Sequence, residues 1–191
     1  MILSQTYTQS LKKELHAYAE ERRKLIADAG QALHHAKRVI FSLHRGDMTE
    51  ARERHTNAEN MLKAITKMHK KNSKLLSEGS LKAAMEEFVE ASMFLNFVQK
   101  KPLGKITSVS IPAEVYIAGL ADVPGELYRY AIRAATNGDI KTVHACNNLS
   151  SEIIGALIDI DLTSYLRTKV DQAKSAAQKL EHVVYELSLR K

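Results

Sequence analysis

The sequence contains few of the residues that build disulfide frameworks, sheets and tight turns. Its 191 residues include one Cys, three Pro, eight Gly and no Trp. The single cysteine, Cys146, cannot form an internal disulfide or a Cys-based zinc site, which argues against a secreted, disulfide-stapled protein. Clusters of β-branched residues are scarce, which disfavours a sheet-rich fold. An all-α domain is the class that remains.

Long uncharged apolar runs are also missing. No stretch approaches the roughly 18 to 20 apolar residues that span a membrane, and the first residues lack the charged flank and apolar run of a signal peptide. The length suits one continuous hydrophobic core, and the sequence contains no internal repeat or low-complexity segment. We therefore expect one soluble, cytoplasmic domain over residues 1–191, without contact to a membrane.

Positive charge is concentrated in the first part of the chain. Lys and Arg outnumber Asp and Glu by 28 to 22 overall, which gives a net charge of +6. Residues 1–76 hold 15 basic and 8 acidic side chains, whereas residues 77–191 hold 13 and 14. A basic surface attracts polyanions through phosphate neutralisation and counterion release, so the pattern favours RNA or DNA as a partner. The alternative is a solvated basic face that binds no nucleic acid.

Helical periodicity begins near the N-terminus. Apolar and small side chains recur every three or four residues between Leu11 and Leu43, with Arg22 at the one polar position of the seam. The pattern predicts one helix from Ser4 to Arg45, on the order of 60 Å long at 1.5 Å per residue. A globule of this size cannot hide such a helix completely, so we expect part of it to contact another subunit.

Further helices follow, bounded by capping residues, Pro and Gly, with one linker at residues 101–110. In the last helix, apolar positions alternate at spacings of four and three residues over three heptads, which is typical of a coiled-coil seam. The sequence therefore predicts an all-α antiparallel bundle of about six to seven helices. The predicted segments are Asp47 to about Gly79, Ser80 to Phe97, Pro112 to Asn137, Asp139 to about Ile158, and Leu166 to Leu187.

Two pairs of carboxylates interrupt apolar stretches of the third and fourth predicted helices. Glu87 and Glu90 lie about one turn apart, as do Asp122 and Glu126. If these helices pack antiparallel, the pairs converge, and four acids so close together repel one another unless some are protonated or a cation binds. Oxygen ligands favour Mg²⁺ or Mn²⁺ over zinc or copper.

A structural interpretation of the same acids stays open. In it, Glu86 faces solvent and the other acids pair with Lys82, Arg129 or Arg133. No Glu-x-x-His motif occurs in a predicted helix, which weakens a di-iron interpretation. The sequence also lacks a glycine-rich phosphate loop and a Ser-His-Asp order, so NTP hydrolysis and acyl transfer have no support.

Four segments of the sequence resemble the translin family, and within it the branch of translin-associated factor X (TRAX). They are AKRVIFSLHR at residues 36–45, EEFVEA at 86–91, YIAGLADVPGELYR at 116–129 and EHVVYELSLR at 181–190. The resemblance implies an all-α fold and a hollow homo-oligomer, often an octameric barrel. In that family the TRAX subunits are metal-dependent endoribonucleases, whereas translin subunits bind nucleic acid and lack the acidic set.

The resemblance also implies which residues act. It places the catalytic, metal-binding carboxylates on Glu87, Glu90, Asp122 and Glu126. The implied activity is Mg²⁺- or Mn²⁺-dependent hydrolysis of RNA, mainly single-stranded. Two positions depart from the family pattern, because Glu86 stands where Gln is common and Pro124 where Thr is common. Pro124 also removes one helix hydrogen bond beside the site.

Basic side chains of the first helix are the predicted RNA contacts, and their alternative role is an exposed face or an ion pair between subunits. Arg22 lies on the apolar seam, where it either pairs with an acid or reaches into an RNA channel. Arg129 is expected to pair with Glu126 or to stabilise charge on a phosphate. The predicted RNA contacts are Arg22, Arg23, Lys37, Arg38, His44 and Arg45.

Three functions therefore follow from the sequence. The first is a metal-dependent endoribonuclease. The second is a single-stranded DNA- or RNA-binding protein in which the acids are structural and no turnover occurs. The third is a helical scaffold whose basic face binds a protein partner.

Overall fold

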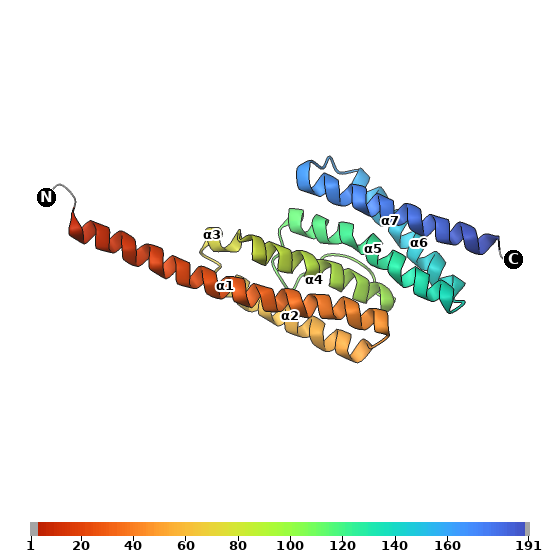
Figure 1. Ribbon diagram of the computed structural model, residues 1–191, viewed down its shortest axis with the longest axis horizontal. Coiled ribbons are helices and arrows are strands. Elements are labelled where there is room, and N and C mark those ends of the chain that lie inside the picture. Colours follow the sequence, from red (N-terminus) through yellow and green to blue (C-terminus); the bar gives the residue numbers. More distant parts are fainter. Residues whose placement is uncertain (1–3, 190–191) are drawn as a thin grey trace.

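The computed structural model describes residues 4–189, which form seven helices and no strand. The all-α class predicted from the sequence is confirmed, and none of the described helices is long and apolar enough to cross a membrane. Arg190, the last residue of one family-like segment, lies outside the described residues. The helices are α1 (Gln5–Arg45), α2 (Met48–Met68), α3 (Ser73–Leu76), α4 (Gly79–Val98), α5 (Ala113–Thr136), α6 (Ile140–Ile158) and α7 (Ser164–Ser188) (Figure 1).

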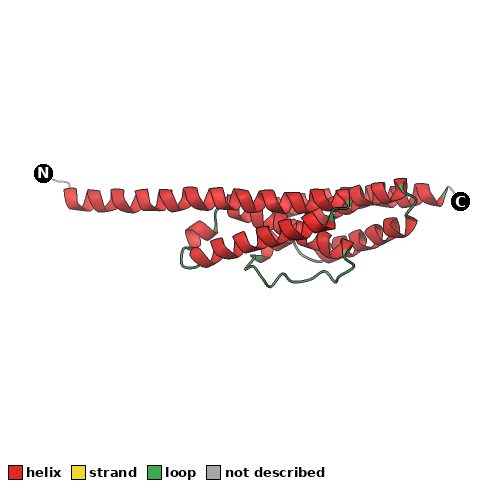
Figure 2. Cartoon of the chain, turned by 90° about the horizontal axis from the view of Figure 1, so that it is seen from below, coloured by secondary structure: helices red, strands yellow, loops and turns green. Residues whose placement is uncertain are grey.

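Four helices lie side by side in the order α1, α4, α5, α7 and run in the same direction (Figure 1). The helix α2 packs on α1 and α4, whereas α6 packs on α5 and α7, and both run back against them. Figure 2 shows the flat, elongated shape that results. Residues at the same level of the four parallel helices are thus brought together from distant parts of the sequence.

The parallel packing of α4 and α5 differs from the antiparallel packing assumed for these two helices. Lys82 contacts Glu114, and the backbone of Glu86 lies against Gly119, so positions increase together along both helices. The cause is the length of the connection at residues 99–112. Its 14 residues can reach about 46 Å, more than the roughly 30 Å of α4. The chain therefore returns to the start of α4 before α5 begins (Figure 1).

Two other bounds differ from the sequence prediction. The predicted second helix is broken after Met68, and Asn72 begins α3 by accepting a hydrogen bond from the backbone N–H of Leu75 at 3.1 Å. No Gly or Pro lies at this break, which explains why the pattern missed it. The helix α4 starts at Gly79 with Glu78 at its N-cap, while the predicted cap, Ser80, has its hydroxyl buried without a partner.

The N-terminal half of α1 projects from the rest of the molecule (Figure 1). Ser4 caps the helix by accepting from the backbone N–H of Tyr7, and the first buried residue is Leu25. The intervening stripe includes Leu11 and Leu15, which are 40% and 66% exposed. A helix too long to be buried by its own subunit was predicted from the sequence, and the described residues confirm it.

The closest approach between α4 and α5 occurs at Gly119. A Cβ atom at this position would overlap the carbonyl oxygen of Glu86 and lie 2.8 Å from the Cβ atom of Val89. The first atom belongs to the backbone of α4, and the second to the fully buried side chain of Val89. The contact sets Glu86 level with the first third of α5, so Gly119 determines how closely the acidic segments of the two helices approach.

Replacement of Gly119 by Ala is expected to destabilise the fold. The added methyl group forces the backbones of α4 and α5 apart, and overpacking of this kind costs about 1–3 kcal/mol. Urea unfolding measures the change. Gly125→Ala is the matched control, because its Cβ meets nothing within 4 Å and Ala is the better helix former by about 0.5–1 kcal/mol. Equal stability of the two variants would contradict the assigned close contact.

Exposed apolar side chains on the projecting part of α1 are expected to be covered by a second copy of the chain. Wild-type protein at micromolar concentration should have a mass that is a multiple of 21.4 kDa in light scattering. Leu15→Glu introduces charge into the stripe and should shift the mass towards that of the monomer. Gln9→Glu adds the same charge off the stripe and should leave the mass unchanged. A monomeric wild type would refute this assembly.

Candidate active site

Acidic side chains of α4 and α5 meet in the middle of the helix layer. Glu87 and Glu90 of α4 each experience the negative charges of Asp122 and Glu126 of α5. The structure thus brings together all four carboxylates that the sequence singled out. They converge from parallel helices, and the close approach of α4 and α5 at Gly119 makes this possible.

Glu90 is the most buried of these acids. It is 8% exposed, and among the described residues its carboxylate has no hydrogen bond or ion pair. Burial and then the negative charges of Glu87 and Asp122 raise the pKa of Glu90 to about 9. At pH 7 the neutral acid is therefore favoured at Glu90, and a nearby cation would favour the carboxylate.

The other three acids have basic partners. Burial raises the pKa of Glu87, although Lys37 lies 4.0 Å away. Burial likewise raises the pKa of Asp122 despite the opposing ammonium group of Lys169. For Glu126, the hydrogen bond with His44 and the charge of Arg129 outweigh burial, so its pKa lies below the ordinary value. Arg129 thus forms the expected pair with Glu126, at 3.0 Å.

Lys169 of α7 is a site residue that the sequence analysis missed. Its Nζ atom lies 2.6 Å from Oε1 of Glu86 and 2.5 Å from Oδ2 of Asp122. Glu86 also accepts a hydrogen bond from the hydroxyl of Tyr165 at 2.8 Å, so it does not face solvent as the structural interpretation required. A signal was present: Lys169 lies three residues after Leu166, on the inward side of the coiled-coil seam.

A groove of about 390 Å³ opens beside the acids, between α1, α4 and α5. Glu87 and Glu126 lie at its acidic side, and most of the remaining polar lining is basic or histidine. The groove thus joins the acid cluster to a surface suited to phosphate. Its basic and histidine residues are His34, Lys37, Arg38, His44 and Arg129.

Three of the six predicted RNA contacts line this groove. Lys37 is exposed, while Arg38 is engaged with Glu50 at 2.6 Å. The third, His44, is bound to Glu126 and stacks near Phe94. These positions place the C-terminal end of α1, from Lys37 onward, against the acid cluster.

The remaining predicted contacts lie elsewhere on α1. Arg22 forms a bidentate ion pair with Glu78 at 2.6 and 3.0 Å, which selects the pairing alternative for this residue. It lies about 22 Å along the helix from Lys37 at 1.5 Å per residue, and Arg23 beside it is exposed. Arg45 is exposed and lies over the ring of Phe41, 5.4 Å from its centre.

The acids fit a hard divalent cation in chemistry but are not drawn together around one point. Within residues 4–189, no three Asp, Glu, His or Cys side chains have the arrangement of a metal site. The ion pairs give the reason, because Lys169 holds Asp122 towards α7 and His44 holds Glu126 towards α1. The donors are all carboxylate oxygens, and the buried Glu90 lacks a counter-ion, which is the donor set that Mg²⁺ or Mn²⁺ requires.

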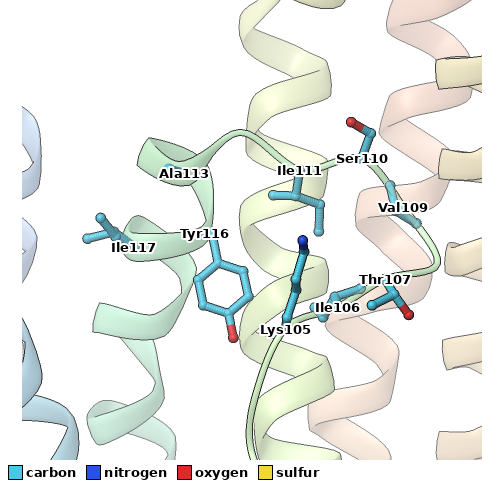
Figure 3. A pocket seen from close by; sticks show the side chains of 9 residues that line it. All are labelled: Lys105, Ile106, Thr107, Val109, Ser110, Ile111, Ala113, Tyr116 and Ile117. Carbon is cyan, nitrogen blue, oxygen red and sulfur yellow. The ribbon is translucent and has the colours of Figure 1, made fainter.

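A larger cavity of about 710 Å³ lies away from these acids, beneath the connection between α4 and α5 (Figure 3). Lys105 and Tyr116 both line it, and the hydroxyl of Tyr116 donates to the carbonyl of Gly104 at 2.8 Å. The lining contains no acid and none of the predicted site residues. This cavity therefore adds nothing to the chemistry of the acid cluster.

The sequence and the fold match known proteins over nearly the whole chain. Translin-associated protein X of Mus musculus is 23% identical over 223 residues, which cover 95% of this chain and 77% of that protein. Two solved structures, apo-NeC3PO and AfC3PO in a complex with duplex RNA, each superpose with a TM-score of 0.86. Their sequence identities are 20% and 21%, and each match covers 97% of this chain and 98% of the other.

A family model adds the decisive match. It is that of the translin family, and it covers residues 20–191, which include every residue named in the acid cluster and the groove. The chain belongs to the translin family.

Proposed function

We propose that the protein is a metal-dependent endoribonuclease that binds RNA along the groove and hydrolyses a phosphodiester beside the acid cluster. The observation that carries the proposal is the placement of the buried Glu90 among Glu87, Asp122 and Glu126 at the edge of a basic groove. Buried acids without a counter-ion are costly, and structures retain them where they act.

Under this proposal, the acidic residues would bind the metal ion and the basic residues would bind the phosphate. Mg²⁺ or Mn²⁺, when bound, would polarise a phosphate oxygen and lower the pKa of a water molecule. Glu87, Glu90 and Asp122 would hold the ion, with Glu126 assisting. Arg129, adjoining Glu126 in the groove, is placed to offset charge on the phosphate.

RNA is the proposed substrate because the groove is basic and because both the family resemblance and one solved structure point to it. Lys37, Arg38 and Arg129 supply the positive charge that a phosphate backbone requires. The resemblance to TRAX implies single-stranded RNA, whereas AfC3PO was solved with duplex RNA. Both forms of RNA therefore belong in the same cleavage assay. The projecting half of α1 supports assembly of the protein into a homo-oligomer, and the family resemblance suggests an octamer.

A nucleic-acid-binding protein without turnover is the second candidate function. It is favoured by the ion pairs that occupy Asp122, Glu126 and Glu87 in the absence of metal. Under this alternative the acids only position basic residues of α1 and α7. Cleavage by acid variants separates the two functions.

Glu90→Gln and Asp122→Asn are each expected to lower the rate of RNA cleavage by a factor of about 100 or more, the scale typical of a lost catalytic group. Both variants should still bind RNA. Each substitution preserves side-chain volume but removes a charged oxygen ligand. Cleavage of labelled single-stranded and duplex RNA is measured with Mg²⁺, Mn²⁺ or EDTA. Glu114→Gln, at an exposed acid of α5 that pairs with Lys82, is the control and should cleave normally. Retained cleavage in both site variants would refute the assignment.

The same Glu90→Gln variant has a second readout in stability. Glu90 ionises near 4.5 in the unfolded chain and near 9 in the fold, so the folded protein loses stability as the pH rises from 4.5 through 9. Gln mimics the protonated acid and removes this loss. In EDTA, the variant should therefore melt above wild type by a margin that grows between pH 5 and pH 9. A margin that stays constant would show that Glu90 is not held neutral.

RNA affinity is expected to fall steeply with salt because the contacts are to phosphate. Lys37→Gln should weaken binding and reduce the slope of log K against log salt by about 1. Fluorescence anisotropy at several salt concentrations measures this slope. Lys141→Gln changes an exposed lysine of α6 outside the groove and should leave the slope unchanged. A flat salt response of the wild type would favour the protein-binding scaffold instead.

A further inference from the structure

Lys169 joins three helices through one ammonium group. From α7 it reaches Glu86 of α4 at 2.6 Å and Asp122 of α5 at 2.5 Å, and its side chain is only 15% exposed. Tyr165, one turn earlier on α7, donates to the same Glu86 at 2.8 Å, and its ring centre lies 5.5 Å from Nζ of Lys169. The ammonium is thus fixed in position rather than free to sample solvent.

No other basic group of the described residues contacts these two acids. On the α1 side, Lys37 reaches Glu87 and His44 reaches Glu126. Arg129 of α5 also pairs with Glu126, and Lys82 of α4 pairs with the exposed Glu114. Among the described residues, therefore, Lys169 is the only cation in contact with Glu86 or Asp122.

The position of this ammonium bears directly on cation binding. Asp122, whose Oδ2 atom contacts Lys169, also acts through its negative charge on Glu87 and Glu90 of α4. A divalent cation placed on Asp122 would lie close to a second positive charge, and the two repel. Lys169 and a metal ion therefore compete for the same carboxylate.

We propose that Lys169 is a positioning residue that serves as an internal counter-cation, holding Asp122 while no metal is bound and yielding that carboxylate when a divalent cation enters. The competition between Lys169 and a metal ion for Asp122 rests on the proposed metal-dependent function. The stabilisation of the metal-free protein by the ion pairs of Lys169 does not rest on that function. The role goes beyond a surface ion pair, because removal of the ammonium changes the affinity for metal as well as stability.

The test is Lys169→Gln, studied with Mn²⁺ alone as the probe. In EDTA the variant should melt below wild type, because the half-buried Glu86 and Asp122 are left without a cation and repel one another. Its affinity for Mn²⁺, measured by calorimetry and by the spin resonance of free Mn²⁺, should rise roughly tenfold because one competing positive charge is gone. Neither readout depends on RNA cleavage.

Matched variants separate this role from ordinary packing. Lys174→Gln removes a lysine of the same helix that lies 4.0 Å from the exposed Asp171, and it should change neither melting nor affinity. Lys169→Arg keeps the charge and should restore wild-type behaviour. Where Lys169→Gln does not fold in EDTA, the double variant with Asp122→Asn removes both partners and should recover the fold.

The outcomes are distinct. Tighter Mn²⁺ binding with a lower melting temperature in EDTA supports the proposal. Unchanged or weaker Mn²⁺ binding by Lys169→Gln, with metal binding retained by wild type, overturns it and leaves the proposed nuclease function standing. Absence of Mn²⁺ binding in wild type and in all variants overturns the competition together with the metal-dependent function.

Discussion

Buried negative charge where α4 meets α5 is the constraint on which the rest of the site depends. The close contact at Gly119 places acids of both helices in a space with little water, where repulsion and lost hydration oppose folding. The fold answers this with partners from two further helices: the ammonium groups of Lys37 from α1 and Lys169 from α7, and the imidazole of His44, which is hydrogen-bonded to Glu126. These helices can all reach the cluster because α1, α4, α5 and α7 are parallel and put these residues at one level.

The helices themselves could be predicted largely from local sequence. Caps such as Ser4 and Asp139 and the helix-ending Gly46 act within a few residues, so their signals are readable without a structure. The break before Asn72 was missed because it is made by a side-chain cap without Gly or Pro. Helix direction was also missed, since periodicity carries no information on it. The length of residues 99–112, which allows a return along α4, was the only clue.

The candidate site, like the fold, could be predicted only in part from the sequence. The carboxylates were identified from short motifs and from resemblance to a family, both of which are local properties of the chain. The basic partners of these acids were not identified, because they are distant in sequence. Lys169 is 47 residues from Asp122 and 83 residues from Glu86. Arg22 shows the converse case, in which a charge on an apolar seam required a partner but only the fold identified it as Glu78. A polar residue on a buried seam is therefore the sequence signal for such partners.

The ion pairs of the acids also link RNA binding to metal binding in the proposed function. Phosphate entering the groove brings negative charge towards Glu87 and Glu126, and it competes with these acids for Lys37 and Arg129. Acids that lose their basic partners need another cation, which a divalent ion supplies while also offsetting the phosphate. Under the proposed function, RNA therefore raises the affinity of the acid cluster for metal, and by thermodynamic linkage metal raises the affinity for RNA by the same factor. Under this proposal, an acid cluster held by basic side chains would become a strong metal site once RNA is bound.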